Sequence, residues 1–332
     1  MRVAIIGAGF SGLALSYHLL QYPSCNVTIF DGKGIGAESS GIASGLLHPY
    51  PGEKGRITWK SFEGMQATKE LLAVSEKALG RPVADTGGIL RFIPSSEGNT
   101  FLEHEKVYKD VSPIGNGWFL LKSGMTVYTS LYLEGLWKAV SSLGAKLHTL
   151  FIDHFNALDE YDCIIVAAGA GTLGLLQMEV ELQQIKGQIL TCKIPEEHSL
   201  TNSLIGKGYI ATMPEPGYCH VGATYERGFT SLSPNIQTAK ELLYPKLSLF
   251  YPKVVDFPIE DCKAAVRVAR KGHYIPFVKK MGEKHWVITA LGSRGLLYHG
   301  YLGKILASAI VEEKEAMLPE ELGSAVIKNV VL

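Results

Sequence analysis

The sequence predicts an α/β fold in which a Rossmann-like nucleotide-binding domain is joined to an α+β domain built on a predominantly antiparallel β-sheet. Two observations support this prediction. A strand, a glycine-rich turn, a helix and a second strand follow one another within residues 2–31. Between residues 185 and 262, short strands of alternating polarity are separated by turns such as Pro214 to Gly217, which is typical of an antiparallel sheet with one solvated face.

The N-terminal unit has the residues that a dinucleotide site needs. The apolar run 3–6 leads directly into Gly-x-Gly-x-x-Gly, and an apolar helix pattern over 13–20 precedes a second strand over 27–30. The first glycine of this motif permits a sharp turn, the second lets a pyrophosphate approach the backbone, and the third allows close packing of helix on strand. Phosphate binds the free N–H groups at the helix start, and the acid after the second strand accepts hydrogen bonds from a ribose. The residues predicted to bind the dinucleotide here are Gly7, Gly9, Phe10, Ser11, Gly12 and Asp31.

The composition is that of a globular protein. The 332 residues are 46% hydrophobic and 19% charged, with a mean hydropathy of +0.12, and they are enough for two domains. Lys+Arg and Asp+Glu both number 32, so the net charge gives no sign of a polyanionic partner. Five scattered cysteines without a C-x-x-C pair indicate reduced thiols and a cytoplasmic location. No apolar run reaches the length of about 18 residues that a membrane span requires, and no His, Cys and carboxylate spacing suggests a metal site.

The segment 32–56 is rich in glycine, serine and proline. Composition alone is compatible with a flexible loop. Small residues with free N–H groups so soon after a nucleotide motif also suit a second approach to phosphate or to a flat ring.

Residues 57–171 alternate between helical and strand patterns. Helices are predicted where apolar residues recur every three or four positions, and strands where apolar residues run together or alternate. These elements are a helix over 57–80, a strand over 85–93 broken by two glycines, a short helix over 101–108, a strand over 118–121, a helix over 131–143 and a strand over 145–151. An apolar strand over 162–167 then meets Ala-Gly-Ala-Gly, a turn that either packs in the core or approaches a bound group.

The later chain changes character and then returns to buried strands. Short strands are predicted over 185–190, 209–212, 219–226 and 254–257, with a helix over 235–250. Apolar strands follow within 264–278 and 286–291, then a Gly-x-x-Gly turn at 292–295, a helix over 299–311 and a polar surface tail over 312–321.

These motifs, with Gly-Leu-Leu-His-Pro at 45–49, resemble the D-amino-acid oxidase superfamily of FAD enzymes, which includes glycine oxidase, sarcosine oxidase and the oxidoreductase domain of a tRNA wobble-uridine modifying enzyme. The resemblance implies noncovalent FAD, because Cys262 lies several residues too early for the cysteine tether of some relatives. It implies contacts to the pyrophosphate and flavin from Ser39, Ser40, Ala43, Ser44, Gly45 and Leu46. It also implies a closing turn at Ala168 and Gly169, and stabilisation of charge on the flavin by the turn Gly292, Ser293, Arg294, Gly295 and Leu296.

The resemblance further implies a discontinuous domain organisation. The FAD-binding domain is expected to comprise 1–82, 121–185 and 262–332, and the substrate domain 83–120 and 186–261. Two departures from the family pattern stand out. About ten residues, 152–161, replace a small three-stranded excursion, and Gly272 or His273 occupies the place of the family's aspartate in Asp-x-x-Pro.

The candidate catalytic residues are those that would hold an amino acid over a flavin. Arg267 and Arg294 lie where glycine-oxidase-like members carry active-site arginines, and a planar guanidinium suits a carboxylate; a surface salt bridge is the alternative for each. His48 and Tyr50 are candidates to line the substrate side and to orient an amine or a water, with core packing as the alternative. Tyr225 and Tyr298 are weaker candidates of the same kind.

Three functions are compatible with this sequence. The first is oxidation of the C–N bond of a small amine or amino acid, in which substrate positioning supplies much of the catalysis. The second is oxidative removal of a carboxymethyl group from a tRNA wobble uridine, for which the basic segment 263–284 offers a possible RNA-binding face. The zero net charge and the lack of a methyltransferase half weigh against RNA. The third is a non-catalytic FAD-bound scaffold, suggested only by the missing aspartate.

Overall fold

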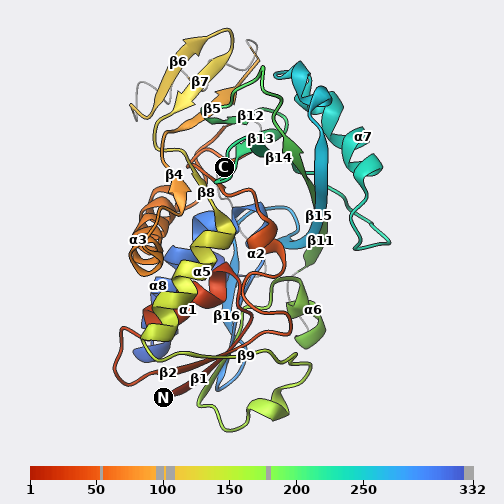
Figure 1. The fold of residues 1–332 in the computed structure, drawn as a ribbon. Coiled ribbons are helices and arrows are strands. Elements are labelled where there is room, and N and C mark those ends of the chain that lie inside the picture. The colour runs from red at the N-terminus through yellow and green to blue at the C-terminus, as the bar shows by residue number, and fades with distance from the viewer. Residues whose placement is uncertain (53–54, 95–100, 102–108, 177–180, 325–332) are drawn as a thin grey trace.

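The computed structural model describes residues 1–52, 55–94, 101, 109–176 and 181–324, and two large β-sheets dominate it (Figure 1). The first has the strand order β16-β17-β10-β1-β2-β9, and the second the order β15-β11-β14-β13-β12-β5-β7-β6. A small antiparallel sheet, β3-β8-β4, lies between the helices of the first sheet and the second sheet. The mixed α/β class predicted from the sequence is therefore present.

The first sheet is built around the N-terminal strand. Its strands are β1 (Arg2–Ile6), β2 (Asn26–Phe30), β9 (Lys146–His148), β10 (Cys163–Val166), β16 (Phe277–Lys280) and β17 (His285–Thr289). All adjacent pairs are parallel except β16 with β17. Val3, Ala4 and Ile5 are fully buried, as expected for a central parallel strand covered on both faces.

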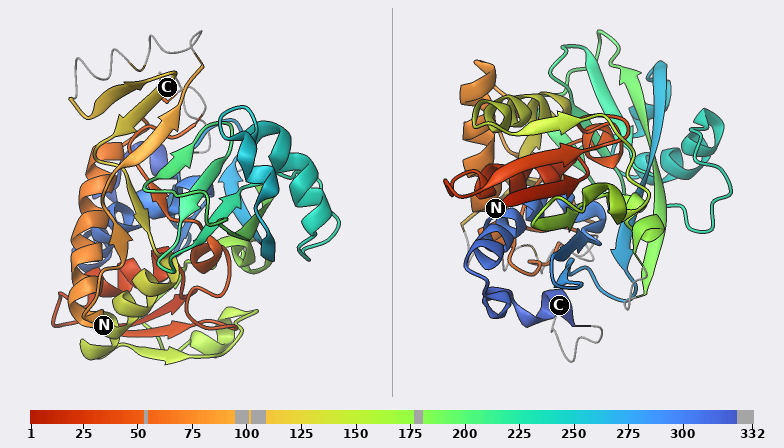
Figure 2. Two further views of the ribbon diagram at one scale, coloured as in Figure 1. Left: turned by 45° about the horizontal axis from the view of Figure 1, so that its top comes forward. Right: turned by 90° about the horizontal axis from the view of Figure 1, so that it is seen from below.

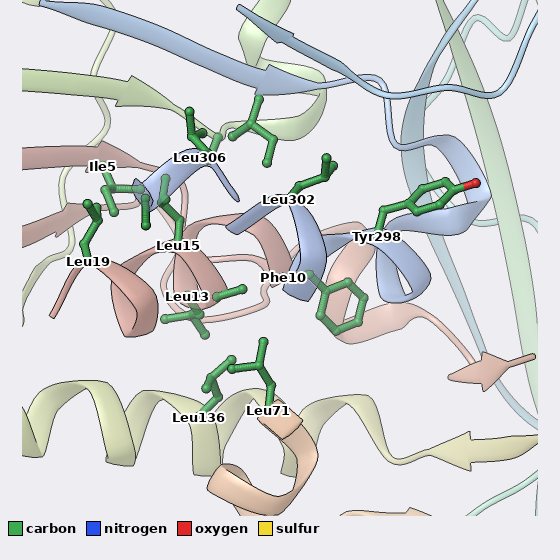
Figure 3. Packing of buried hydrophobic residues seen from close by; sticks show 14 of the residues in the cluster. Ile5, Phe10, Leu13, Leu15, Leu19, Leu71, Leu136, Tyr298, Leu302 and Leu306 are labelled. Carbon is green, nitrogen blue, oxygen red and sulfur yellow. The ribbon is translucent and has the colours of Figure 1, made fainter. Parts of the chain in front are cut away.

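Four helices cover one face of this sheet. They are α1 (Phe10–Leu19), α3 (Ser61–Leu79), α5 (Thr129–Ser142) and α8 (Gly295–Val311). Figure 3 shows Leu71 of α3 and Leu136 of α5 pointing toward Leu13 of α1, and all three side chains are completely buried. This apolar layer fixes the start of α1 against the strands, at the sheet edge where the glycine motif lies.

The second sheet carries the long strands of the fold. Its members are β5 (Ile89–Phe92), β6 (Val111–Gly115), β7 (Trp118–Leu121), β11 (Leu182–Lys193), β12 (Ser203–Ile205), β13 (Tyr209–Thr212), β14 (Tyr218–Gly222) and β15 (Ile259–Arg270). All adjacent pairs are antiparallel except β12 with β5. Helix α7 (Ile236–Leu247) packs on its outer face, far from α1, α3, α5 and α8 (Figure 2). The opposite face therefore looks toward the nucleotide-binding turn.

The remaining elements are short. They are α2 (Ser39–Ile42), β3 (Leu46–Leu47), β4 (Ala84–Asp85), β8 (Met125–Val127), α6 (Thr172–Leu175), α9 (Glu320–Gly323) and 3-10 turns at Phe155–Leu158, Gly169–Gly171, Pro252–Asp256, Gly292–Arg294 and Glu315–Met317. Among the described residues no helix is both long and apolar enough to cross a membrane, and no three His, Cys or carboxylate side chains form a metal-binding group.

The structure corrects several predicted elements. The strand predicted over 254–257 is a 3-10 turn, because Val254 buries its side chain against α7 instead of pairing with a strand. The last long helix begins at Gly295 rather than 299, and the helix expected from 57 begins at Ser61. The helix predicted over 101–108 lies outside the described residues except for Phe101. The division into two discontinuous domains stays a prediction.

Candidate cofactor and substrate site

A cavity of about 860 Å³ lies between the two sheets, at the carboxyl ends of β1, β2 and β10. Its walls come from the glycine turn, the segment 36–48, the turn after β10, the inner faces of β11 and β15, and the start of α8. The structure thus gathers into one space nearly all the residues predicted to bind the cofactor, namely Gly7, Gly9, Phe10, Ser11, Asp31, Ser39, Ser40, Ala43, Ser44, Gly45, Leu46, Ala168, Gly169, Gly292, Ser293, Arg294, Gly295 and Leu296. Their role in binding stays a prediction.

The three motif glycines occupy different environments. Gly7 has a φ of +114°, and a Cβ there would overlap the carbonyl oxygen of Ala167. A Cβ on Gly9 would lie 2.8 Å from the Ser40 hydroxyl, inside the cavity wall. Gly12 does not line the cavity; a Cβ there would overlap the carbonyl oxygen of Gly7, so its absence allows α1 to sit against the turn. The backbone is thus open at Gly9, where a pyrophosphate would approach.

The polar groups around the glycine turn are arranged to receive a nucleotide. One carboxylate oxygen of Asp31 accepts the Ala8 N–H at 2.8 Å, and the other accepts those of Lys33 and Gly34 at 2.9 Å each. These bonds hold the carboxylate at the cavity wall. The first turn of α1 contains no acidic residue, and the Phe10 N–H donates to the Ser40 hydroxyl at 3.1 Å. The positive end of α1 is therefore available to an anion, which fits the diphosphate of a dinucleotide.

A second helix terminus faces the same cavity from the other side. Helix α8 begins directly after the turn Gly292–Arg294, and its first turn has no acidic residue. Opposite, Gly45 has a φ of +74°, and a Cβ there would overlap the Val127 carbonyl oxygen. The loop before it is held by the Thr129 hydroxyl, which donates to the Ala43 carbonyl at 2.8 Å. A flat ring between these walls would have fixed N–H dipoles near one edge.

Arg267 projects from β15 without an acidic partner. One guanidinium nitrogen donates to the Thr224 carbonyl at 3.1 Å, and the guanidinium carbon lies 5.8 Å from the centre of the Tyr225 ring. Burial lowers the pKa of Arg267, although the neighbouring Tyr209 and Tyr225 phenols partly oppose this. No carboxylate pairs with it among the described residues.

Arg294 is the second cation of the cavity. It donates to the Thr58 hydroxyl at 2.7 Å and stacks over the Tyr274 ring at 4.2 Å. Burial lowers the pKa of Arg294, and it too lacks a carboxylate partner in the part of the chain that the structure describes. Tyr298 is completely buried and bonds to Thr58 at 3.0 Å, so it supports this arginine rather than lining the cavity.

Sequence reasoning missed Tyr209. Its ring lines the cavity, its phenol oxygen accepts a hydrogen bond from the Ser44 hydroxyl at 2.9 Å, and burial raises its pKa. The signal was available in the alternation of β13, because Ile210 packs toward α7 and Tyr209 must then face the other way.

The predicted pair His48 and Tyr50 is separated by the fold. His48 lines the cavity, where burial and the nearby Arg91 cation lower its pKa to about 3, so the ring is neutral at neutral pH. Its Nδ1 accepts the Tyr50 N–H at 3.2 Å. Tyr50 is fully buried and packs against Phe101, and it is not part of the cavity wall. The expectation that Tyr50 lines the substrate side is therefore corrected: its side chain belongs to a separate core cluster.

His273 occupies the position of the missing aspartate and makes a local turn. Its Nδ1 accepts the Ile275 N–H at 3.2 Å, and Gly272 before it has a φ of +87°. A carboxylate oxygen at this position would accept the same N–H. The departure is thus compensated within the turn.

Comparisons with known proteins agree with this geometry. A family model described as "FAD dependent oxidoreductase" matches residues 2–309. The chain is 23% identical to D-aspartate oxidase of Homo sapiens over 257 residues, covering 73% of this chain and 74% of that protein. It is 29% identical over 165 residues to the tRNA 5-methylaminomethyl-2-thiouridine biosynthesis bifunctional protein of Idiomarina loihiensis, covering 48% of this chain and 27% of that protein.

Solved structures share the fold over almost the whole chain. Iminodiacetate oxidase from Chelativorans sp. BNC1 matches with a TM-score of 0.80 at 20% identity, covering 97% of this chain and 98% of that chain. Glycine oxidase from Geobacillus kaustophilus matches with a TM-score of 0.79 at 16% identity, covering 98% of this chain and 100% of that chain. The predicted fold class is confirmed.

Proposed function

Because the chain belongs to the DAO family of FAD-dependent oxidoreductases, we propose that it oxidises the C–N bond of a small amine or amino acid. The observation that carries the proposal is the pair Arg267 and Arg294, two cations without acidic partners among the described residues, in a cavity reached by the starts of both α1 and α8. The names of relatives that oxidise amino acids are consistent with it. FAD, when bound, supplies a hydride acceptor.

The chain's own residues would bind and orient the substrate. One Arg267 nitrogen donates to the Thr224 carbonyl, and its other guanidinium N–H groups can donate to a carboxylate; the Tyr209 phenol can donate a further hydrogen bond, since its oxygen already accepts from Ser44. Because Nδ1 of neutral His48 accepts the Tyr50 N–H, its Nε2 carries the ring proton and can donate a hydrogen bond without bringing a charge into the site. Positioning of this kind converts binding energy into rate.

The test uses the purified yellow protein under anaerobic conditions. Glycine, sarcosine, proline and a panel of D-amino acids are added in turn, and the flavin absorbance band is followed. Bleaching by at least one compound is expected; a flavin that no amine bleaches would leave only the non-catalytic FAD-bound scaffold or the second candidate below.

Substitution of Arg267 tests the assignment of the carboxylate site. Arg267→Met is expected to raise KM at least tenfold, since a charge-assisted hydrogen bond contributes about 1.5–3 kcal/mol. Lys263→Met, an exposed cation on the same strand, is the control and should leave KM unchanged. An unchanged KM for Arg267→Met would refute the assignment.

A second candidate is action on a modified tRNA wobble uridine, favoured by the 29% identity to the tRNA-modifying relative. The predicted basic segment gives it limited support. Lys263, Lys271 and Lys284 lie within 4 Å of Asp261, Glu181 and Asp159, and Arg270 is buried. Salt-sensitive retention of tRNA by the protein, together with flavin bleaching only by the modified nucleoside, would favour this function over the first.

We also propose a reducing compartment such as the cytoplasm. All five cysteines are free and buried. Stable disulfides are rare in cytosolic proteins, so free cysteines support this proposal.

A further inference from the structure

Arginine and tyrosine side chains form two groups beside the cavity, which together we call the arginine–tyrosine cluster: Arg227, Tyr225 and Arg267 in one group, and Arg294 and Tyr274 in the other. The Tyr225 ring centre lies 5.8 Å from the guanidinium carbon of Arg267 and 5.3 Å from that of Arg227. The Tyr274 ring lies under Arg294 at 4.2 Å. The Arg227 guanidinium also donates to the Tyr225 hydroxyl at 3.4 Å, a contact that raises the pKa of Arg227.

The cluster extends from the cavity wall to solvent. Arg267 and Arg294 line the cavity, whereas Tyr225 and Tyr274 are 48% and 50% exposed and Arg227 is exposed. Its members come from the loop after β14, from β15, from the turn before β16 and from the start of α8.

The charge of this cluster is not balanced by protein acids. None of its three guanidinium groups pairs with a carboxylate within the described residues. Glu226, although between Tyr225 and Arg227 in sequence, turns inward, where it accepts hydrogen bonds from Gln188 and Thr224. Arg227 is exposed and solvated, but burial lowers the pKa of Arg267 and of Arg294, so a counter-charge from a ligand would stabilise these two cations.

A substrate with a single carboxylate would neutralise only one of the two arginines that line the cavity. We propose that the amine substrate carries two carboxylates, the one next to the amine held by Arg267 and the second held by Arg294 over Tyr274. This inference rests on the proposed function and names its substrate class, an amino or imino dicarboxylic acid. Fixed guanidinium groups of this kind select a dianion by complementary charge and by planar hydrogen bonding.

Binding of unreactive acids tests the inference independently of turnover. Succinate and butyrate have the same chain length and differ in one carboxylate, and their dissociation constants for the flavin-loaded protein are measured by titration calorimetry. Succinate is expected to bind at least tenfold more tightly than butyrate. Equal affinities would overturn the proposal.

Substitution of Arg294 supplies the residue-level test. Arg294→Gln should weaken succinate binding about tenfold, as loss of one charge-assisted contact predicts, and should change butyrate binding much less. Lys240→Gln is the matched control, because Lys240 also lies over a tyrosine ring, that of Tyr244 on α7, but outside the cavity. Equal weakening of both acids by Arg294→Gln, or an equal effect of Lys240→Gln, contradicts the role of Arg294.

Turnover separates this inference from the proposed function. N-carboxymethylglycine and sarcosine form a matched pair of substrates with two carboxylates and one. A higher kcat/KM for sarcosine would refute the dicarboxylate proposal and leave amine oxidation intact. Selective succinate binding without bleaching by any amine would instead refute amine oxidation while retaining the preference for a dianion.

Discussion

Gly45 shows how a single missing side chain shapes the cavity. Its φ of +74° is left-handed, and a Cβ would overlap the backbone of Val127. Gly45→Ala is therefore expected to lower the free energy of unfolding by at least about 2 kcal/mol, more than the left-handed conformation alone costs. The measurement is urea denaturation followed by circular dichroism.

Gly217→Ala is the matched control for this prediction. Gly217 has a similar φ of +81°, but a Cβ there would meet no atom within 4 Å. Gly217→Ala should therefore lower the free energy of unfolding only by the cost of the left-handed conformation, about 1 kcal/mol. If the two variants lose equal stability, the clash with Val127 does not contribute.

The residues of the site also show where sequence reasoning stops. His48 and Tyr50 lie two positions apart in an irregular segment, so no periodicity tells which of them faces the cavity. The motif glycines could be placed because each has a local reason that is readable from the spacing. Tyr225 and Arg267, and likewise Tyr274 and Arg294, are far apart in sequence and become neighbours only in the folded chain, which no local pattern encodes.

At the scale of elements, a buried hydrogen bond links α5 to α8. The Tyr132 hydroxyl and His299 Nε2 are 2.6 Å apart, and His299 Nδ1 faces the Leu296 carbonyl at 2.9 Å. Since the carbonyl must accept, Nδ1 carries the proton and Nε2 accepts from Tyr132. Both side chains are completely buried.

Tyr132→Phe leaves a buried ring nitrogen without its donor. The expected loss of stability is about 1–3 kcal/mol, measured as a shift of the denaturation midpoint. Tyr22→Phe, which removes a hydroxyl that bonds Ser308 at 3.1 Å in a less buried place, is the control and should cost less. A larger loss for Tyr22→Phe would show that the α5–α8 bond is unimportant.

Elements were predicted best where their pattern is local. The unit β1–α1–β2 is dictated by consecutive apolar runs and glycines, and its bounds differ little from the expected ones. The apolar run at 254–257 was predicted wrongly as a strand because two adjacent valines favour a strand when considered alone. In the folded chain, the packing of Val254 against α7 outweighs that preference, and the segment forms a 3-10 turn.

At the scale of the whole molecule, histidine burial predicts a pH dependence. Desolvation lowers the pKa of His18, His220, His273 and His299 to about 4, and that of His48 to about 3. The unfolded chain, with ordinary histidine values near 6.5, binds more protons between these pH values. The contribution of these histidines to the free energy of unfolding is therefore fully present above pH 6.5, and it is lost as the pH falls toward 4.

The fully buried His299 alone should lower the free energy of unfolding by about 2 kcal/mol between pH 6.5 and 5.0, at about 1.4 kcal/mol per pKa unit. Urea denaturation at pH 7.5 and 5.0 measures the effect. His220→Gln should reduce the difference between the two pH values, whereas His154→Gln, an exposed histidine, should not. Equal stability at both pH values would contradict the burial argument.

The long pairing of β11 with β15 has a mechanical consequence. These strands pair from Leu182 with Arg270 to Cys192 with Ile259, with one register shift between Thr191 and Cys192, and Ala269 near the end of β15 bridges to Leu291, just before the Gly292–Arg294 turn. Arg267 and this turn are therefore both attached to the same strand pair. Loosening either sheet should shift both together, so the molecule is expected to respond to force or denaturant as a single cooperative body.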